Sequence, residues 1–379
     1  MKVSRRGAVP PFIVMDVMQA AADREASGQD VLHMEVGQPS TGAPRGVIEA
    51  AKRELDSDVL GYTLALGIDP LRRRIAAHYR ERYGVEVPPG RVAVTVGSSG
   101  AFLLTFLAAF DAGDRVAILR PGYPCYRNIL STLQIEVVDV PVGPATRFQP
   151  TPELLDAAGP LDGLLLASPA NPTGSMLRRS ELEAVVAWCE RKGVRFLSDE
   201  IYHGIGFGEP AASALEFTQS AIVINSFSKY FSMTGWRLGW TVLPEEMVRP
   251  VERLAQNMFI SPSALAQHAA IAAFDCREEL ERNVVRYAAN RELLLAELPK
   301  AGFDRLAPAD GAFYLYADVR RMTNDSEAFC RAMLKETGVA ATPGMDFDPV
   351  DGRAFVRFSF CGSTEQMAEA ARRLRRWLA

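Results

Sequence analysis

Short apolar runs alternate with helical stretches from about residue 91 to about residue 224 of this chain. The apolar runs are rich in Val, Ile and Leu and have the length of buried strands. Because parallel strands are joined by crossovers that are usually helices, this alternation predicts an α/β fold with a largely parallel sheet between layers of helices. The expected strands are residues 92–96, 115–119, 136–140, 163–167, 194–198 and 222–224.

The C-terminal third has a different pattern, which predicts a second domain. With 379 residues, the chain is too long for one ordinary core. We expect a large domain over residues 46–280 and a smaller α+β domain that combines residues 281–379 with residues 1–45. The elements expected toward the C-terminus are a helical stretch at 263–298, short strands at 312–317 and 355–360, and an amphipathic helix at 364–378.

Composition and charge argue against several classes of function. The net charge of −4 gives no reason to expect nucleic acid as a partner. No apolar run reaches the length of a membrane span and the chain does not start with a signal-peptide pattern, so a cytoplasmic protein without a membrane partner is expected. The five cysteines are scattered and the four histidines do not cluster, so neither a disulfide framework nor a metal site is expected.

Lys229 and Arg237 lie eight residues apart among small residues, just after an apolar run at 221–224. A lysine held in a packed site at a strand end loses its proton more easily than in water and is then a nucleophile for carbonyls. Ser226, Ser228 and Arg237 can together bind a phosphate. An imine-forming lysine beside a phosphate site is what pyridoxal phosphate requires. The alternative is that Lys229 is an ordinary solvated surface lysine.

Other polar and aromatic residues stand where further strands are expected to end. Ser98 and Ser99 open a helix, where free backbone N–H groups form an anion site or where serine merely caps the helix. Tyr123 follows a Pro-Gly turn and can stack on a flat ring, or it simply fills the turn. Asn171 lies between two prolines, which is also a common turn sequence. Asp199, 28 residues further on, ends a buried strand and requires a cationic partner there.

Arg357 stands among aromatic and β-branched residues in the strand expected at 355–360. A guanidinium there is costly unless it meets an anion, either a protein carboxylate or that of a substrate. With these motifs, above all the Asn-Pro-Thr-Gly string that begins at Asn171, the chain resembles the class I aminotransferases, pyridoxal phosphate enzymes with the aspartate aminotransferase fold. The resemblance extends over residues 10–378 and implies a mostly parallel seven-stranded sheet and a homodimer whose active sites are shared between chains.

The resemblance also implies a role for each motif residue. Lys229 is expected to carry the cofactor and to move a proton, and Asp199 to keep the pyridine nitrogen protonated. Tyr202 is expected to place its hydroxyl beside Asn171 and the cofactor's phenolic oxygen, and Arg357 to bind the substrate's α-carboxylate. The remaining expected contacts are those of Ser98, Ser99, Ser226 and Arg237 with the cofactor phosphate, of Tyr62 with the phosphate of the neighbouring subunit, of Tyr123 with the face of the ring, and of Gly37 and Asn171 with the substrate.

These roles predict a pyridoxal phosphate-dependent aminotransferase that moves an amino group from an L-amino acid to a 2-oxo acid by a ping-pong mechanism. A neutral or aromatic donor is favoured over aspartate, because residues 10–15 are apolar and no lysine occurs at 97–101. Two alternatives stay open on the same fold: an aspartate aminotransferase, and a carbon–sulfur lyase or decarboxylase. The sensor domain of a transcription regulator is disfavoured, because the chain has no length to spare for a DNA-binding domain.

Overall fold

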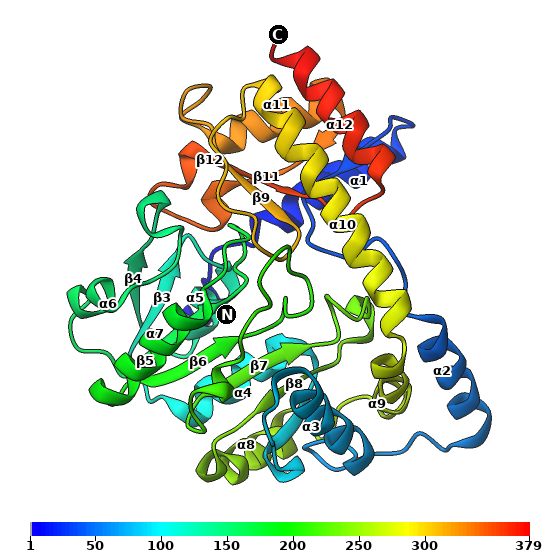
Figure 1. Ribbon diagram of the computed structural model, residues 1–379, viewed down its shortest axis with the longest axis vertical. Helices are drawn as coiled ribbons and strands as arrows, with labels where there is room; N and C mark the ends of the chain where they lie inside the picture. Colours follow the sequence, from blue (N-terminus) through cyan, green and yellow to red (C-terminus); the bar gives the residue numbers. More distant parts are fainter. Residues whose placement is uncertain (1) are drawn as a thin grey trace.

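A seven-stranded sheet lies at the centre of the larger part of the molecule (Figure 1). The computed structural model describes residues 2–379. Along the sheet the strands follow the order β2-β8-β7-β6-β5-β3-β4, and every adjacent pair from β7 to β4 is parallel. The strands are β2 (Val92–Thr95), β3 (Arg115–Arg120), β4 (Glu136–Pro141), β5 (Gly163–Ala167), β6 (Arg195–Asp199), β7 (Ile222–Ser226) and β8 (Gly239–Val242).

Strand β8 is the exception in this sheet, because it runs antiparallel to both β7 and β2. The sequence pattern did not predict it, since its 4 residues directly follow the lysine motif and are too few to show a period. The sheet is therefore mostly parallel and seven-stranded, as predicted, and β8 is the strand that was missing from the sequence prediction.

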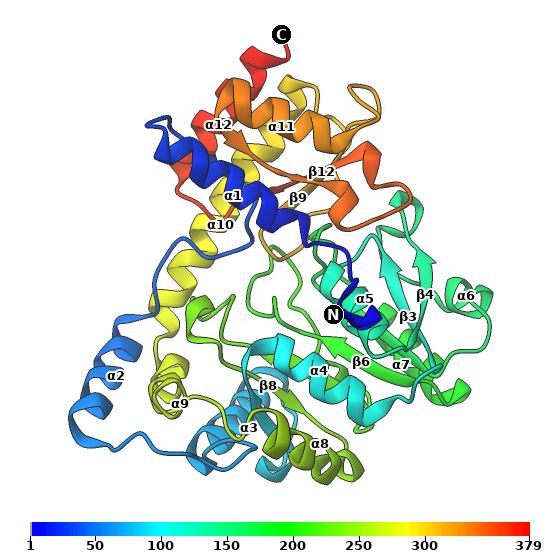
Figure 2. The same cartoon turned by 180° about the vertical axis from the view of Figure 1, so that it is seen from behind.

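Alternate residues of the central strand β5 point into two different cores. Leu164 and Leu166 belong to the core that includes residues of α3 and α7, whereas Leu165 belongs to the core with α4, α5 and α8. This explains why the strand reads as one continuous apolar run and confirms that helices cover both faces of the sheet. Figure 2 shows α4 and α8 in front of the sheet. The helices are α3 (Asp69–Tyr83), α4 (Gly97–Ala109), α5 (Pro124–Thr132), α6 (Pro152–Ala157), α7 (Arg179–Lys192) and α8 (Glu245–Met258).

The smaller part of the molecule combines the two ends of the chain, as predicted. Its three-stranded sheet has the order β11-β12-β9, and β1 near the N-terminus pairs with β10. Helix α1 lies beside these C-terminal elements in both Figure 1 and Figure 2. The boundaries near residues 45 and 280 stay a prediction. The elements are α1 (Ile13–Ala26), β1 (Leu32–His33), β9 (Tyr314–Asp318), α11 (Ser326–Thr337), β10 (Val339–Ala340), β11 (Thr342–Pro343), β12 (Phe355–Ser359) and α12 (Thr364–Trp377).

The helical stretch expected at 263–298 consists of two helices, α9 (Ala264–Ile271) and α10 (Arg277–Glu297). A 3-10 turn over Ala272–Asp275 separates them, which the helical pattern of the sequence did not indicate. Helix α9 packs against α2 (Arg45–Ser57) in the larger part, and α10 then runs into the smaller part (Figure 1). Helix α10 thus connects the two parts of the molecule.

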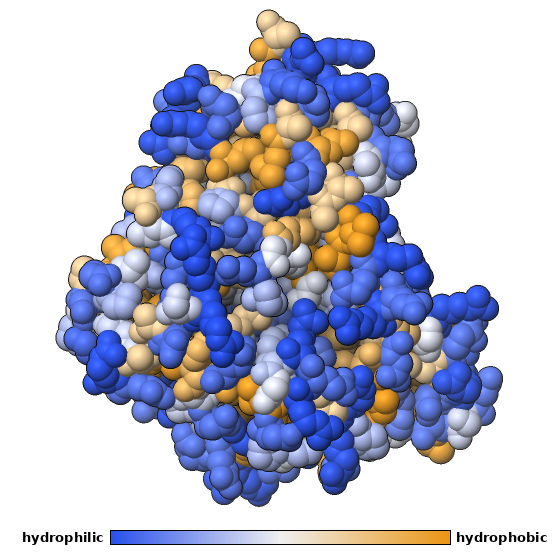
Figure 3. All heavy atoms as spheres, viewed as in Figure 1, coloured by the Kyte–Doolittle hydropathy of each residue, from blue (hydrophilic) through white to orange (hydrophobic). Residues whose placement is uncertain are grey.

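The face drawn in Figure 3 is mostly hydrophilic, with apolar side chains in smaller groups. Within residues 2–379, no helix combines the length and the apolar character needed to cross a membrane. The largest side chains that are fully buried include Trp240, Tyr287 and Phe358, so bulky apolar groups fill the interior of both parts.

Candidate active site

A cavity of about 220 Å³ lies at the carboxyl ends of the central strands, between the large sheet and the smaller part of the molecule. In open α/β sheets this end is the usual place of a ligand site. Loops that follow β3, β5, β6 and β7 meet there with the start of α4 and with β12. The predicted site residues that line the cavity are Gly37, Ser98, Ser99, Tyr123, Asn171, Asp199, Tyr202, Lys229, Arg237 and Arg357.

The Lys229 amine projects into this cavity, where Nζ donates a hydrogen bond to the carbonyl oxygen of Gly37 at 2.6 Å. Burial lowers the pKa of Lys229 to about 8. The guanidinium groups of Arg357 and Arg237 also lower this pKa, whereas Asp199 opposes the shift. A lysine with such a pKa is partly neutral near physiological pH, so it can act as a nucleophile or as a base.

Asp199 is the last residue of β6, and two donors hold its carboxylate. The Tyr126 hydroxyl donates to Oδ2, and the backbone N–H of Ile201 donates to Oδ1 at 3.0 Å. Burial raises the pKa of Asp199 to about 6, and these two hydrogen bonds oppose that rise. A carboxylate held in this way can face a cationic group of a ligand as an anion near neutral pH.

Arg357 is buried in the middle of β12. Its Nη1 donates to Asn171 Oδ1 at 2.8 Å, and its Nη2 donates to Thr342 Oγ1 at 3.2 Å and to the carbonyl oxygen of Glu35. The guanidinium carbon lies 4.5 Å from the centre of the Tyr314 ring. All these acceptors are neutral, and Nε has no hydrogen-bond partner within residues 2–379. A buried guanidinium with neutral acceptors alone favours an anion from outside the chain.

A second anion site lies at the start of α4, where Ser98 and Ser99 form part of the first turn. No side chain of the described residues caps this turn, so its backbone N–H groups are available to a ligand. Gly97 has a φ of +67°, and a Cβ on it would lie 2.5 Å from Nη2 of Arg237. Glycine therefore lets the guanidinium approach the helix N-terminus, and together these groups suit a phosphate-like anion.

The family model described as "Aminotransferase class I and II" matches residues 29–374 of the chain. This chain belongs to that family. It is an aminotransferase, an enzyme that moves an amino group between an amino acid and a 2-oxo acid. The resemblance to class I aminotransferases with the aspartate aminotransferase fold is thereby confirmed.

Relatives of this aminotransferase align over its whole length. The "Valine--pyruvate aminotransferase" of Mycobacterium tuberculosis is 52% identical over 382 residues, which cover 100% of this chain and 98% of the relative. An "Aspartate aminotransferase" of Thermotoga maritima is 32% identical and covers 99% of both chains. Among solved structures, an aminotransferase from Mycobacterium tuberculosis has a TM-score of 0.98 at 52% identity, and covers 100% of this chain and 99% of that one. Thermus thermophilus aspartate aminotransferase with maleate has a TM-score of 0.93 at 30% identity and covers 99% of both.

Two predicted residues of the aminotransferase lie away from the cavity. Ser226 stands behind its wall and donates to Ser228 Oγ at 2.9 Å, while Ser228 itself lines the cavity. The Tyr62 side chain is 86% exposed and does not line the cavity of its own chain. Tyr62 was predicted to act in the neighbouring subunit, and its exposure leaves it accessible to a second chain.

Two tyrosines of the aminotransferase site were not predicted. Tyr126 follows Tyr123 by three residues and lies in the first turn of α5, for which Tyr123 is the N-cap residue, and the two ring centres lie 5.3 Å apart. This short spacing in the sequence is a signal that could have indicated Tyr126. Tyr314 comes from β9, and its hydroxyl lies 2.8 Å from that of Tyr202. A Cβ on Gly37 would lie 1.7 Å from the Tyr314 hydroxyl, which explains why residue 37 is glycine. No sequence pattern connects Gly37 with Tyr314.

An apolar wall closes one side of the cavity and was predicted only in part. The apolar residues at 10–15 favour a neutral or aromatic donor, but the sequence pattern predicts no helix there. In the structure α1 begins within this segment, and Asp346 accepts a hydrogen bond from the Ile13 N–H at 2.8 Å at the helix start. The residues of the apolar wall are Phe12, Val14, Met15, Met18 and Val36.

Proposed function

We propose that this aminotransferase uses pyridoxal phosphate and takes a neutral, apolar L-amino acid as donor, with pyruvate or 2-oxoglutarate as acceptor. The observation that carries the proposal is one cavity with both the buried Arg357, which has only neutral acceptors within residues 2–379, and the apolar wall. The relative that is 52% identical is named "Valine--pyruvate aminotransferase", which supports a branched-chain donor. We place the enzyme in the cytoplasm, where its five free cysteines stay reduced.

The residues around the cavity fit pyridoxal phosphate. The start of α4 and Arg237 suit the phosphate, and the buried carboxylate of Asp199 suits a protonated pyridine nitrogen. When bound, the cofactor supplies an aldehyde and an electron-withdrawing ring. The residues that would hold it are Ser98, Ser99 and Arg237 at the phosphate, with Ser226 behind them, Asp199 at the ring nitrogen, Tyr123 on the ring face, and Asn171 and Tyr202 at the phenolic oxygen.

Different residues of the chain transfer the proton, bind the substrate carboxylate and exclude water. Lys229 has a pKa of about 8, so its Nζ can accept a proton from a donor's α-carbon and return it to a neighbouring atom. Arg357 holds the donor's carboxylate and Asn171 supports the guanidinium. The apolar wall and the Tyr123 ring exclude water from the site. One site that serves donor and acceptor in turn gives ping-pong kinetics.

The cations that line the cavity of one chain favour a donor with a single carboxylate. Its lining contains Lys229, Arg237 and Arg357 as cationic side chains. Arg237 faces the phosphate site and Lys229 is the reacting amine, so Arg357 alone is left for a substrate carboxylate. The distal carboxylate of aspartate would then be buried without a cation, which costs on the order of several kcal/mol.

We also propose that the working unit is a homodimer. Exposed apolar side chains flank the place where the Thr63 N–H donates to Ser261 Oγ at 3.3 Å. Tyr62 and Leu64 lie on one side of this contact, and Ile260 lies on the other, with exposures of 86%, 71% and 51%. A second copy that covers them would bring Tyr62 of the partner subunit toward the phosphate site. Sedimentation that shows a fully active monomer at assay concentration would contradict this.

The proposed function is tested with the purified holoenzyme and one amino acid at a time. Valine, alanine, leucine, phenylalanine and aspartate are each mixed with the enzyme, and the cofactor absorbance reports the first half-reaction. Valine or leucine should lead, and aspartate should be the slowest. An aspartate rate about tenfold above the others would mean a missed cation. Without a 2-oxo acid acceptor, an aminotransferase forms at most one equivalent of 2-oxo acid per active site, so release of carbon dioxide or of 2-oxo acid beyond one equivalent would indicate a decarboxylase or a lyase.

Lys229→Ala tests the cofactor assignment. The variant should retain the phosphate site and lose transamination by several orders of magnitude, because no other lysine lines the cavity among residues 2–379. Borohydride reduction of the unaltered holoenzyme, followed by peptide mapping, should locate the pyridoxyl group on Lys229. A label on a different lysine would refute the assignment.

A further inference from the structure

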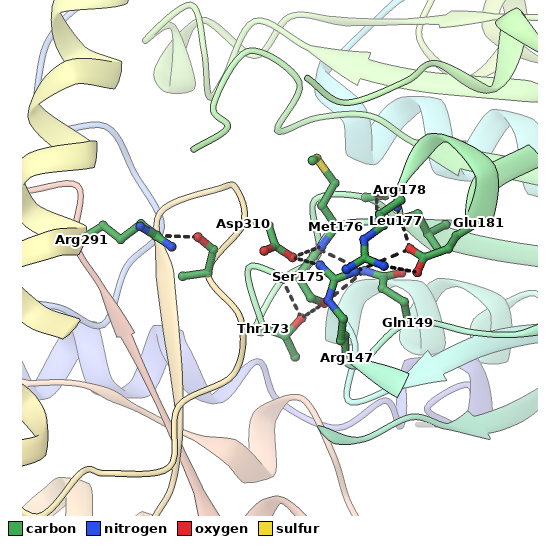
Figure 4. A network of polar contacts seen from close by, with 12 residues as sticks. Arg147, Gln149, Thr173, Ser175, Met176, Leu177, Arg178, Glu181, Arg291 and Asp310 are labelled. Carbon is green, nitrogen blue, oxygen red and sulfur yellow. Dashed lines mark hydrogen bonds and ion pairs between the residues drawn. The ribbon is translucent and has the colours of Figure 1, made fainter. Parts of the chain in front are cut away.

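The loop that carries Asn171 is held from outside the cavity by a polar network (Figure 4). The Ala170 N–H donates to the carbonyl oxygen of Ser175 at 2.9 Å, so the turn closes on itself. Gln149 Nε2 donates to that same carbonyl oxygen at 3.0 Å and to Ser175 Oγ at 3.1 Å. The Thr173 hydroxyl lies 2.8 Å from Ser175 Oγ. Groups behind the loop therefore fix the place from which Asn171 projects.

Asp310 ties this loop to the segment that leads into β9. Its Oδ2 accepts hydrogen bonds from the Met176 N–H at 3.1 Å and from Arg147 Nη2 at 2.6 Å. The next residue, Gly311, donates its N–H to the carbonyl oxygen of Gly174 at 2.9 Å. Figure 4 shows the Arg147 guanidinium beside the Asp310 carboxylate. One carboxylate and one backbone hydrogen bond thus join the loop to the segment.

The loop and the segment that Asp310 joins each carry a neighbour of Arg357. On the loop side, Asn171 Oδ1 accepts a hydrogen bond from Arg357 Nη1 at 2.8 Å. On the other side, Tyr314 follows Asp310 by four residues, and the centre of its ring lies 4.5 Å from the guanidinium carbon. Asp310 therefore joins the two segments that carry the neighbours of the Arg357 guanidinium: the loop with Asn171 and the strand with Tyr314.

The fold holds Arg147 in a backbone conformation that it would not adopt alone. Arg147 and Phe148 have φ values of +53° and +58°. Two successive left-handed residues that are not glycine are costly and persist only where their surroundings impose them. Phe148 is buried in the core, and Arg147 reaches Glu181 at 3.6 Å as well as Asp310. The direction of Arg147 is thus set by more than one ion pair.

We propose that Arg147 and Asp310 are positioning residues for the substrate carboxylate and act on Arg357 through Asn171 and Tyr314. The inference rests on the proposed function, because it requires Arg357 to bind a carboxylate. The alternative is an ordinary surface ion pair, since the two side chains are 31% and 29% exposed. Such a pair contributes little to stability and is screened by salt. If the pair positions Arg357, its loss should weaken the binding of a carboxylate and change the stability of the protein little. If it is an ordinary surface ion pair, its loss should change neither the binding nor the stability.

The variants separate the parts of the junction. Asp310→Ala removes the acceptor of both hydrogen bonds, Asp310→Asn keeps an acceptor for the Met176 N–H, and Arg147→Met removes the cation alone. Arg147→Lys keeps a cation and should restore part of the function. Glu136→Gln is the matched control, because it breaks a comparable pair with Arg115, at 3.2 Å, at the ends of β3 and β4 that point away from the cavity.

Two measurements use the holoenzyme, the donor half-reaction with valine and calorimetric binding of isovalerate, a carboxylate without an amine. Asp310→Ala should raise the KM for valine about tenfold and weaken isovalerate binding by the same factor, with kcat changed by less than about threefold. Asp310→Asn and Arg147→Met should change the same quantities in the same direction by less. The control should change neither. The midpoint of thermal unfolding should stay close to that of the wild type in Asp310→Asn and Arg147→Met, which keep an acceptor for the Met176 N–H, whereas Asp310→Ala leaves that N–H without one.

Unchanged KM and isovalerate affinity in Asp310→Ala would overturn the inference, and so would an equal effect of Glu136→Gln. A loss confined to kcat would also contradict it, because carboxylate binding would then be intact. Failure of the proposed function has a different result: the wild-type enzyme would bind isovalerate but fail to transaminate valine. In that case the isovalerate affinities of the variants still decide whether Arg147 and Asp310 position Arg357.

Discussion

Tyr126 donates a hydrogen bond to Asp199, and this contact joins the start of α5 to the end of β6 in the buried floor of the cavity. Burial raises the pKa of Tyr126 well above its usual value, so the phenol stays protonated and remains a donor. A donor of this kind stabilises the ionised form of a carboxylate. The hydrogen bond from Tyr126 therefore offsets part of the rise in the pKa of Asp199 that burial causes.

Tyr126→Phe removes this donor and keeps the ring. The pKa of Asp199, which is about 6 with the bond, should rise further, so fewer molecules carry the anion at neutral pH. We expect the acid limb of the pH profile of kcat/KM for valine to move up by about one pH unit. Tyr316→Phe is the control, because the buried Tyr316 hydroxyl has no hydrogen-bond partner within residues 2–379. An acid limb that stays in place would show that Tyr126 does not sustain the charge of Asp199.

Asp199→Asn should stabilise the cofactor-free protein while it abolishes activity. Folding raises the pKa of Asp199 from 3.8 to about 6. Between these values the folded state binds more protons than the unfolded state, so the contribution of Asp199 to stability is largest below this window and is lost as the pH rises through it. Above it, the asparagine variant should exceed the wild type by on the order of 1 kcal/mol or more. Thermal unfolding at about pH 8 and about pH 4 measures this, and an advantage of equal size at both would contradict it.

The arrangement of strands could be predicted from the sequence because the strands of the parallel sheet are buried on both faces. Continuous apolar runs such as that of β5 leave a clear signal, and a helix follows most of them. Strand β8 left no such signal, because it is short and belongs to the same segment as the lysine motif. The break between α9 and α10 was also missed, because the residues between them, Ala272–Asp275, contain no glycine or proline that would mark a helix end.

Residues of the candidate site could be predicted where they follow a strand in a recognisable motif. Asn171, Asp199 and Lys229 each belong to a local string, and parallel strands bring their ends to one edge of the sheet. Tyr314 and the apolar wall depend on the packing of the smaller part against the large sheet, which no local pattern encodes. The functional roles of all these residues stay predictions until the variants are measured.

Gly37→Ala should impair the enzyme because of one contact. The new Cβ would lie 1.7 Å from the Tyr314 hydroxyl, so either the tyrosine or the loop must move. Since Gly37 also accepts the hydrogen bond from Lys229, we expect kcat/KM to fall by about tenfold or more. Gly42→Ala is the control in the same segment, because a Cβ there meets nothing within 4 Å. A Gly37→Ala enzyme with normal kinetics would show that the loop yields easily.

Met15→Arg should change the donor preference of the enzyme. Met15 lies on the apolar wall, yet its side chain is 54% exposed, so a guanidinium at this position can remain hydrated at rest and reach a ligand in the cavity. A second cation would pair with the distal carboxylate of aspartate, whose burial without a partner is the proposed reason for its exclusion.

We therefore expect the ratio of kcat/KM for aspartate to that for valine to rise by about tenfold, mainly through a lower KM for aspartate. Gln19→Arg is the matched control, because residue 19 lies one turn further along α1, is exposed and does not line the cavity. The same increase in both variants would mean that a general electrostatic attraction of the anionic substrate is responsible. No increase in Met15→Arg would mean that the substrate side chain points away from the apolar wall, and the assignment of this wall to the donor side chain would then be wrong.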